Sequence, residues 1–220
     1  MKPFDPATLT PVQLAALRRA SAAGARSAVA AISGMTGWTL ERPVPKVRSL
    51  RPDDVTSLMG GAEIEMVGLR LGIRGEPRGE LLIALQPASA HRILGALLPG
   101  APPLASLEEM SPIEESALRE AGNILGAAYL GALGSTFGRA LIPTVPELAI
   151  DMAGALTDDL LVRTGRGAES TLVIEVEIGA KDHGPVAHLL HLPDSGCLPA
   201  MLAALSALDA IRPSPDPFGV

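Results

Sequence analysis

Apolar residues along the 220-residue chain recur with helical spacing in some segments and alternate with polar residues in others. Helical spacing predicts long helices over 11–35 and 112–137, further helices over 87–98 and 198–208, and short ones over 52–61 and 153–163. Strand patterns cover 63–71, 80–86, 172–178 and 186–192. The proline-containing segments 38–50 and 141–150 are predicted to be extended, because a residue before proline avoids the helical region.

The order of these elements in residues 11–98 recurs in residues 111–208. When the chain is shifted by 101 residues, nine of the 32 positions in 16–47 are identical, among them Leu17-Arg18 on Leu118-Arg119 and Val44-Pro45 on Val145-Pro146. Such agreement indicates an internal repeat. We therefore predict an α+β fold in which two pseudo-symmetric α-β-β repeats form one sheet, with the long helices packed on it.

The repeat also predicts the domain organisation. Neither half has enough elements to bury a core of its own, so residues 1–210 are predicted to form a single domain of two intertwined halves. The segment 99–103 links the halves, and the proline-rich residues 211–220 are predicted to be a disordered tail.

Composition narrows the classes of function. A net charge of −6 gives no electrostatic footprint for nucleic acid or an anionic membrane, and aromatic residues make up only 2% of the chain. The single cysteine, Cys197, cannot form an intrachain disulfide and is predicted to be a small buried apolar residue. No segment has the pattern of a signal peptide or a membrane span, so a cytoplasmic protein is predicted.

A polar set on the second long helix is the strongest candidate site. Ser116, Glu120 and Asn123 share one helix face, where a carboxylate can hold a cation and a carboxamide can orient a water. The first repeat has Ala15, Arg19 and Ala22 at these positions. Spacing alone favours an ordinary solvated face. Asparagine and the neighbouring Gly122 are poor mid-helix residues, however, and we interpret the glycine as space for close approach by a partner.

Other polar residues give weaker signals. His188 and His191 differ by an odd number along a strand, so they face opposite sides, and His183 falls in the turn before them. No cysteine or acidic cluster completes a metal site, so these histidines are predicted to lie at the surface or sheet edge, and no metal is expected. No nucleophile and base can be paired by spacing.

The residues Ser116, Glu120, Asn123 and Pro146 resemble the signature of the CheC-type phosphatases of chemotaxis. That signature is Ser or Asp, three residues, Glu, two residues, Asn, 22 residues and Pro. The segment 146–155 and the two strands of the second hairpin are also similar to this family. The resemblance covers about residues 12–208 and implies a CheC-like fold, which CheX, FliY and the middle domain of FliM share.

The resemblance implies a phosphatase that hydrolyses the phospho-aspartate of a CheY-type response regulator. Asn123 would orient the attacking water, Glu120 would contact the active-site lysine of the regulator, and Ser116 would be structural. No cofactor of its own is expected, since the regulator brings Mg²⁺. Pro45 keeps its place in the first repeat, but Arg19 and Ala22 replace the catalytic pair, so one active site is expected.

A second hypothesis stays open. The chain could be a non-catalytic adaptor, similar to FliM, that binds a response regulator or the deamidase CheD. The intact pair Glu120 and Asn123 favours the phosphatase, whereas the altered first repeat favours the adaptor. A phosphate-release assay with a CheY-type regulator separates the two.

Overall fold

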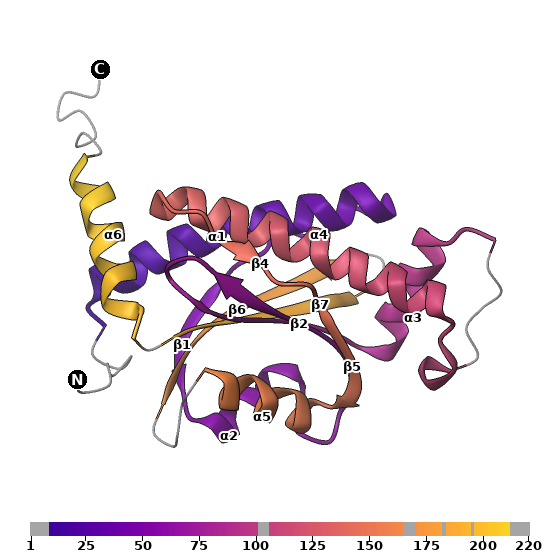
Figure 1. Ribbon diagram of the computed structural model, residues 1–220. Coiled ribbons are helices and arrows are strands. Elements are labelled where there is room, and N and C mark those ends of the chain that lie inside the picture. Colours follow the sequence, from indigo (N-terminus) through magenta and orange to yellow (C-terminus); the bar gives the residue numbers. More distant parts are fainter. Residues whose placement is uncertain (1–8, 101–105, 165–169, 182–183, 195, 212–220) are drawn as a thin grey trace.

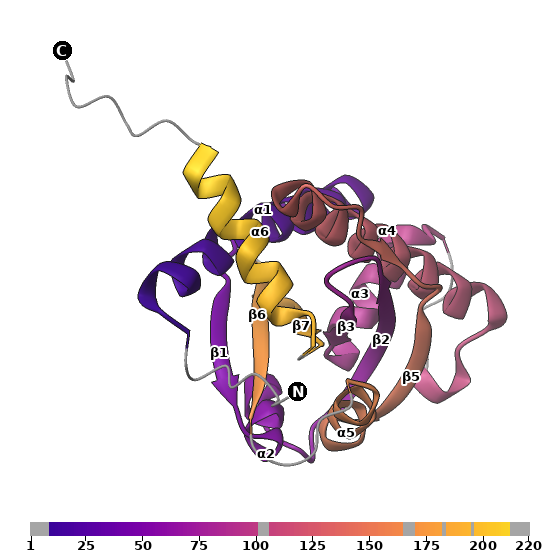
Figure 2. The same ribbon diagram turned by 60° about the vertical axis from the view of Figure 1, so that its left-hand side comes forward.

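In the computed structural model, one antiparallel sheet of seven strands lies between two layers of helices (Figure 1). The structure describes residues 9–100, 106–164, 170–181, 184–194 and 196–211. The long helices α1 and α4 cover one face of the sheet, and the short helices α2 and α5 cover the other. The two views agree on this arrangement (Figure 2). The predicted α+β class, with long helices on a single sheet, is confirmed.

The elements follow the predicted order in both repeats. The first repeat contains α1 (Pro11–Thr36), β1 (Lys46–Leu50), α2 (Pro52–Val55), the 3-10 helix η2 (Thr56–Met59), β2 (Glu65–Arg74), β3 (Gly79–Leu85) and α3 (Pro87–Leu97). The second contains η3 (Leu107–Glu109), α4 (Pro112–Phe137), β4 (Ile142–Pro143), β5 (Glu147–Met152), α5 (Ala153–Arg163), β6 (Thr171–Ala180), β7 (Gly184–Pro193) and α6 (Leu198–Ile211). The predicted tail lies outside the described residues except for Ile211, which ends α6.

The two long helices begin and end in the same way. Thr10 and Gln13 form a capping box at the start of α1, and Ser111 and Glu114 form one at the start of α4. Each box satisfies backbone N–H groups that a helix start leaves without partners. Both helices end at a glycine with positive φ, Gly37 or Gly138, a conformation that favours glycine. The repeat seen in the sequence is therefore also a repeat of local structure.

The halves are intertwined through the sheet. The strand order is β1-β6-β7-β3-β2, and β2 pairs along its outer edge with β5 and β4. The first strand of each half thus pairs with the hairpin of the other half, with Val47 opposite Ile174 and Gly68 opposite Ala149. A pseudo-twofold axis between β7 and β3 relates the halves. The sheet is therefore built from strands of both halves, and neither half contains a complete sheet of its own.

Apolar side chains form a separate core on each face of the sheet. The larger core lies under α1 and α4, and the smaller one lies under α2 and α5. The long helices approach closely where Gly24 meets Tyr129, because a Cβ on Gly24 would lie only 2.8 Å from the Tyr129 ring. Glycine is therefore required there by packing. Of the helices in the described part, none is both long and apolar enough to cross a membrane.

The two strand histidines are buried, so the prediction of surface or edge positions was wrong. His191 faces α4, where its ring packs edge-to-face on Tyr129 with centroids 5.8 Å apart, and its Nδ1 lies 3.3 Å from the Tyr129 hydroxyl. His188 lies opposite Glu177 in the β6–β7 ladder. Burial lowers the pKa of both imidazoles, that of His191 to about 4. Both residues lie on β7, which is an inner strand between β6 and β3, and His183 lies outside the described residues.

Candidate functional site

The polar set predicted on the second helix lies together on the outer side of α4. Ser116 and Glu120 are exposed, and Asn123 is half-buried one turn further along. The opposite side of the same turns packs on the sheet through Leu118 and Leu125. Within the described part of the chain, no other side chain forms a hydrogen bond or ion pair with Glu120 or Asn123. The Glu120 carboxylate is therefore exposed to solvent, and the half-buried Asn123 carboxamide is engaged by no other described side chain.

Gly122 has a different role from the one predicted. It lies on the buried side of α4, where an added Cβ would lie 3.0 Å from Cδ1 of Leu69 on β2. The glycine therefore lets the helix approach the sheet closely and does not clear space for a partner. The prediction that related Gly122 to partner approach was wrong, because the helix face at that position is turned inward.

Arg119 connects the motif helix to the motif proline. Its Nη1 donates a hydrogen bond of 3.3 Å to the carbonyl oxygen of Pro146, and its Nη2 donates one of 3.4 Å to Glu115. Pro146 is buried and directly precedes β5. Sequence reasoning did not select Arg119 as a site residue, although it belongs to the Ala-Leu-Arg stretch that the two repeats share.

A charged cluster beside Pro146 ties β5 to the rest of the fold. Arg70 on β2 forms ion pairs with Glu147, with Glu80 at 2.9 Å and with Asp159 at 3.2 Å. The hydrogen bond from Arg70 lowers the pKa of Glu147. Arg163 joins the cluster through Asp159 at 3.0 Å. One guanidinium thus connects β2, β3, β5 and α5 next to the motif.

Sequence reasoning missed this cluster. Arg70 is one of the polar positions in the alternating pattern that predicted a half-buried strand, so it was expected on an exposed face. In the structure its side chain is only 10% exposed, because the α5 layer covers that face. The sequence did contain a signal for this ion pair. Arg70 and Glu80 have opposite charges, and the predicted hairpin places them on neighbouring strands.

The first repeat keeps the scaffold without the polar pair. Ala15 and Arg19 are exposed on the outer side of α1, Ala22 is half-buried, and Pro45 is buried just before β1. Lys46 follows Pro45 and lies 3.7 Å from Glu175, its partner in the β1–β6 ladder. This pair is the counterpart of Arg70 and Glu147 with the charges exchanged.

Three large apolar side chains are exposed on α4 and beside the motif proline. Ile113 precedes the polar pair on the helix and is 65% exposed, and Val145 beside Pro146 is 81% exposed. Ile124 adds a smaller exposed area next to Asn123. Exposed apolar side chains that form a patch with polar residues at its rim are typical of a protein-binding surface.

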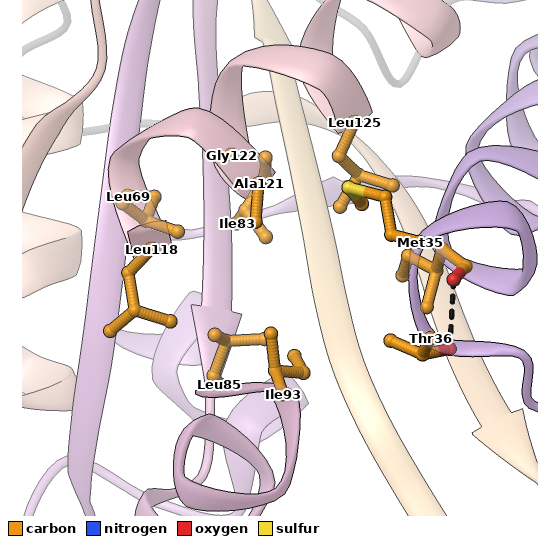
Figure 3. A pocket seen from close by; sticks show the side chains of 11 residues that line it. Met35, Thr36, Leu69, Ile83, Leu85, Ile93, Leu118, Ala121, Gly122 and Leu125 are labelled. Atoms are coloured by element: carbon orange, nitrogen blue, oxygen red, sulfur yellow. Dashed lines mark hydrogen bonds between the residues drawn. The ribbon is translucent and has the colours of Figure 1, made fainter. Parts of the chain in front are cut away.

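The cavity nearest to this site is apolar and lies behind the motif helix. It has a volume of about 20 Å³ and is enclosed by α1, α3, α4 and the sheet (Figure 3). Leu118, Ala121, Gly122 and Leu125 turn toward it, on the side of α4 opposite to Glu120. The polar pair therefore lies outside this cavity. Among the described residues, no three His, Cys, Asp or Glu side chains gather closely enough to hold a metal ion.

Comparison of the sequence with known proteins identifies relatives in chemotaxis. The chain is 28% identical over 199 residues to "CheY-P phosphatase CheC" of Bacillus subtilis, which covers 89% of this chain and 94% of that protein. It is 25% identical over 182 residues to the CheC1 protein of Halobacterium salinarum, covering 83% of this chain and 90% of that protein. No family model matches the chain.

Solved structures share the fold. FliY of Thermotoga maritima superposes with a TM-score of 0.69 at 17% identity, covering 91% of this chain and 98% of that one. The middle domain of FliM from Vibrio alginolyticus has a TM-score of 0.59 at 14% identity, covering 86% and 99%. The chain thus has the fold of FliY and of the FliM middle domain. The predicted resemblance to the CheC-type family is confirmed in both sequence and fold.

Proposed function

We propose that this protein hydrolyses the phospho-aspartate of a CheY-type response regulator at a single site on α4. The observation that carries the proposal is the outward-facing pair Glu120 and Asn123, one helical turn apart and engaged by no other described side chain. Similarity to a protein named as a CheY-P phosphatase over 89% of the chain supports it. The first repeat has Arg19 and Ala22 in place of this pair, so it would not catalyse hydrolysis of the phospho-aspartate.

The proposed reaction is direct attack by water. The side chain of Asn123 accepts a hydrogen bond from the water and aligns its oxygen with the phosphorus. The new bond from water oxygen to phosphorus forms as the bond to the aspartyl oxygen breaks, which releases phosphate and leaves a free carboxylate. Glu120 pairs with the active-site lysine of the regulator. Phosphoryl transfer needs mainly positioning and charge stabilisation, which two side chains on a rigid helix can supply.

The divalent ion in this scheme is Mg²⁺ held by the regulator, so the chain needs no metal or cofactor of its own. The exposed apolar side chains of Ile113, Ile124 and Val145 would contact the regulator and exclude water around the reacting group. Both repeats build one sheet, so we propose a single domain that acts as one rigid body. The proposed partner places the protein in the cytoplasm, and the deamidase CheD is a further candidate partner.

An adaptor that binds a regulator without hydrolysis is the second candidate function. The absence of the polar pair from the first repeat favours it, as does the shared fold with the FliM middle domain. An adaptor would bind the regulator through the same apolar residues, and its Glu120 and Asn123 would have no effect on the lifetime of the phosphoryl group.

Phosphate release from a CheY-type regulator, phosphorylated with acetyl phosphate, distinguishes these functions. Addition of the protein is expected to accelerate release, and Asn123→Ala is expected to reduce this acceleration about 100-fold or more. Ser135→Ala, an exposed change near the other end of α4, is the matched control and should retain full activity. Binding of the regulator without acceleration by the unaltered protein would establish the adaptor instead.

A further inference from the structure

Arg119 on α4 and Arg18 on α1 occupy equivalent positions, 101 residues apart, but have different surroundings. The Arg119 side chain is 41% exposed, and its guanidinium donates hydrogen bonds to the carbonyl oxygen of Pro146 and to Glu115. Arg18 is exposed, and within the described ranges its side chain forms no hydrogen bond or ion pair. Of the two repeats, the one that has the polar pair is thus the one whose arginine is bonded to the proline.

The proline that Arg119 binds is fixed to the sheet on both sides. On one side, the N–H of Thr144 donates a hydrogen bond of 2.8 Å to the carbonyl oxygen of Gly72, and the N–H of Gly72 donates one of 2.9 Å to the Thr144 hydroxyl. On the other side, Glu147 forms an ion pair with Arg70. The carbonyl of the proline is therefore a fixed point at the edge of the sheet, and the Arg119 bond joins α4 to it.

Arg119 lies on the part of α4 that carries the polar pair. Glu120 is the next residue, and Asn123 is one turn further along. Residues four apart are neighbours on a helix surface, so Arg119 and Asn123 lie on the same stripe of α4. The hydrogen bond to the proline therefore holds this turn of the helix against the sheet edge, where Val145 is exposed beside the proline.

We propose that Arg119 is a positioning residue for the dephosphorylation reaction. Its bond to the Pro146 carbonyl sets the place of Asn123 relative to Val145, the exposed residue before the proline. This role rests on the proposed function, in which the regulator contacts Val145 while Asn123 orients the attacking water. The Arg119 guanidinium is engaged by Pro146 and Glu115, so it acts through the position of the polar pair and does not touch the reacting atoms.

The separation of Asn123 and Val145 matters because the regulator is held at one and reacts at the other. A displacement of about 1 Å in a positioned group can lower a reaction rate on the order of 100-fold. When the Arg119 bond is lost, the bonds of Thr144 and Arg70 still hold the sheet edge, so a smaller displacement and about a tenfold loss of rate are expected. The exposed apolar residues are unchanged, so binding of the regulator should change little.

Single-turnover decay of a phosphorylated CheY-type regulator, at increasing concentrations of the full chain, tests the proposal by separating kcat from KM. Arg119→Met keeps the length of the side chain but not its donors, and it should lower kcat about tenfold and change KM less than about threefold. Arg119→Lys keeps a charged donor and should recover part of the lost kcat. Arg18→Met, the same change in the first repeat, is the matched control and should leave both constants unchanged. Glu115→Gln leaves the bond to the proline in place and should also leave kcat unchanged.

Hydrogen–deuterium exchange of the full chain without a regulator measures the positioning itself. The segment 144–148 should exchange faster in Arg119→Met than in the unaltered protein, because the bond from α4 to this segment is lost. In Arg18→Met the same segment should exchange as in the unaltered protein. Circular dichroism checks that each variant is folded.

Acceleration by the unaltered protein together with an unchanged kcat in Arg119→Met overturns the positioning role alone. So does an equal loss of kcat in Arg18→Met. A loss of kcat in Arg119→Met with unchanged exchange of the segment also overturns it, because Arg119 would then act by direct contact with the regulator. No acceleration by the unaltered protein refutes the proposed function on which this role rests, so the two failures are distinguished.

Discussion

Arg70 and Glu147 face each other across the β2–β5 ladder and form an ion pair one residue after the motif proline. The carbonyl of that proline, Pro146, accepts a hydrogen bond from Arg119 of the motif helix. The edge strand β5 and the helix that carries Glu120 are thus joined through neighbouring backbone positions. The nearly buried guanidinium of Arg70 therefore ties β5 to β2 beside this contact with α4.

Replacement of Arg70 by methionine is expected to destabilise the fold and to lower activity. Removal of the guanidinium leaves Glu80, Glu147 and Asp159 near one another without their shared cation. We expect this loss to lower the free energy of unfolding by about 3 kcal/mol. This expected loss is at the lower end of the range for a buried ion pair, because the side chains of Glu147 and Asp159 are half exposed or more. Urea unfolding measures it. Arg51→Met, at the exposed ion pair with Asp54, is the control and should cost less than about 1 kcal/mol.

Glu120→Ala is expected to slow dephosphorylation, whereas Arg19→Ala should leave it nearly unchanged in dilute enzyme. Loss of Glu120 leaves the regulator lysine poorly paired in a closing interface, which costs about 2–5 kcal/mol at such contacts. Arg19 has the opposite charge, and its neighbour Ala22 cannot orient water. Single-turnover decay of the phosphorylated regulator measures both. Equal rate losses in the two variants would contradict a single active site.

Two glycines of α4 are expected to respond in opposite directions to substitution. Gly122→Val places methyl groups against Leu69, where a Cβ alone already lies at 3.0 Å, so we expect a loss of about 1–3 kcal/mol. Gly131 is exposed and has open space around its Cβ direction, so Gly131→Ala should stabilise the helix by about 0.5–1 kcal/mol. Thermal unfolding measures both. Stabilisation by Gly122→Val would contradict the packing role assigned to this glycine.

Stability is expected to fall as the pH decreases from about 6.5 toward 4. The pKa of His191 is about 4 in the folded protein, whereas an unfolded histidine titrates near 6.5. Between these values the unfolded chain binds a proton that the folded protein does not, so acid favours unfolding. The full contribution of His191, present above pH 6.5, is roughly 3 kcal/mol. The lowered pKa of His188 acts in the same direction.

Urea unfolding at a series of pH values from 8 to 5 measures this slope, above the range in which Glu147 titrates. His191→Leu removes the titrating group and should flatten the slope, although Tyr129 then loses its hydrogen bond with His191 and the variant is less stable at neutral pH. An unchanged slope in His191→Leu would show that another group controls the pH dependence.

The sequence alone determined the local structure and the residues of the candidate site. Helical spacing and caps at Thr10 and Ser111 located the two long helices, because capping and amphipathic periodicity depend on residues only a few positions apart. The 101-residue offset predicted the repeat. Helix geometry alone then placed Ser116, Glu120 and Asn123 on one face, and the structure shows that face turned outward.

Only the tertiary structure decided which polar groups are buried and that Gly122 packs against the sheet. The exchange of β1 and β5 between the halves brings Arg70 to Glu147, and α5 then covers a strand face that alternation alone predicted to be exposed. Gly122 faces Leu69 and His191 faces Tyr129 because elements far apart in sequence pack together. Burial is a property of those neighbours and not of the strand's own pattern, so no local rule could have predicted these contacts.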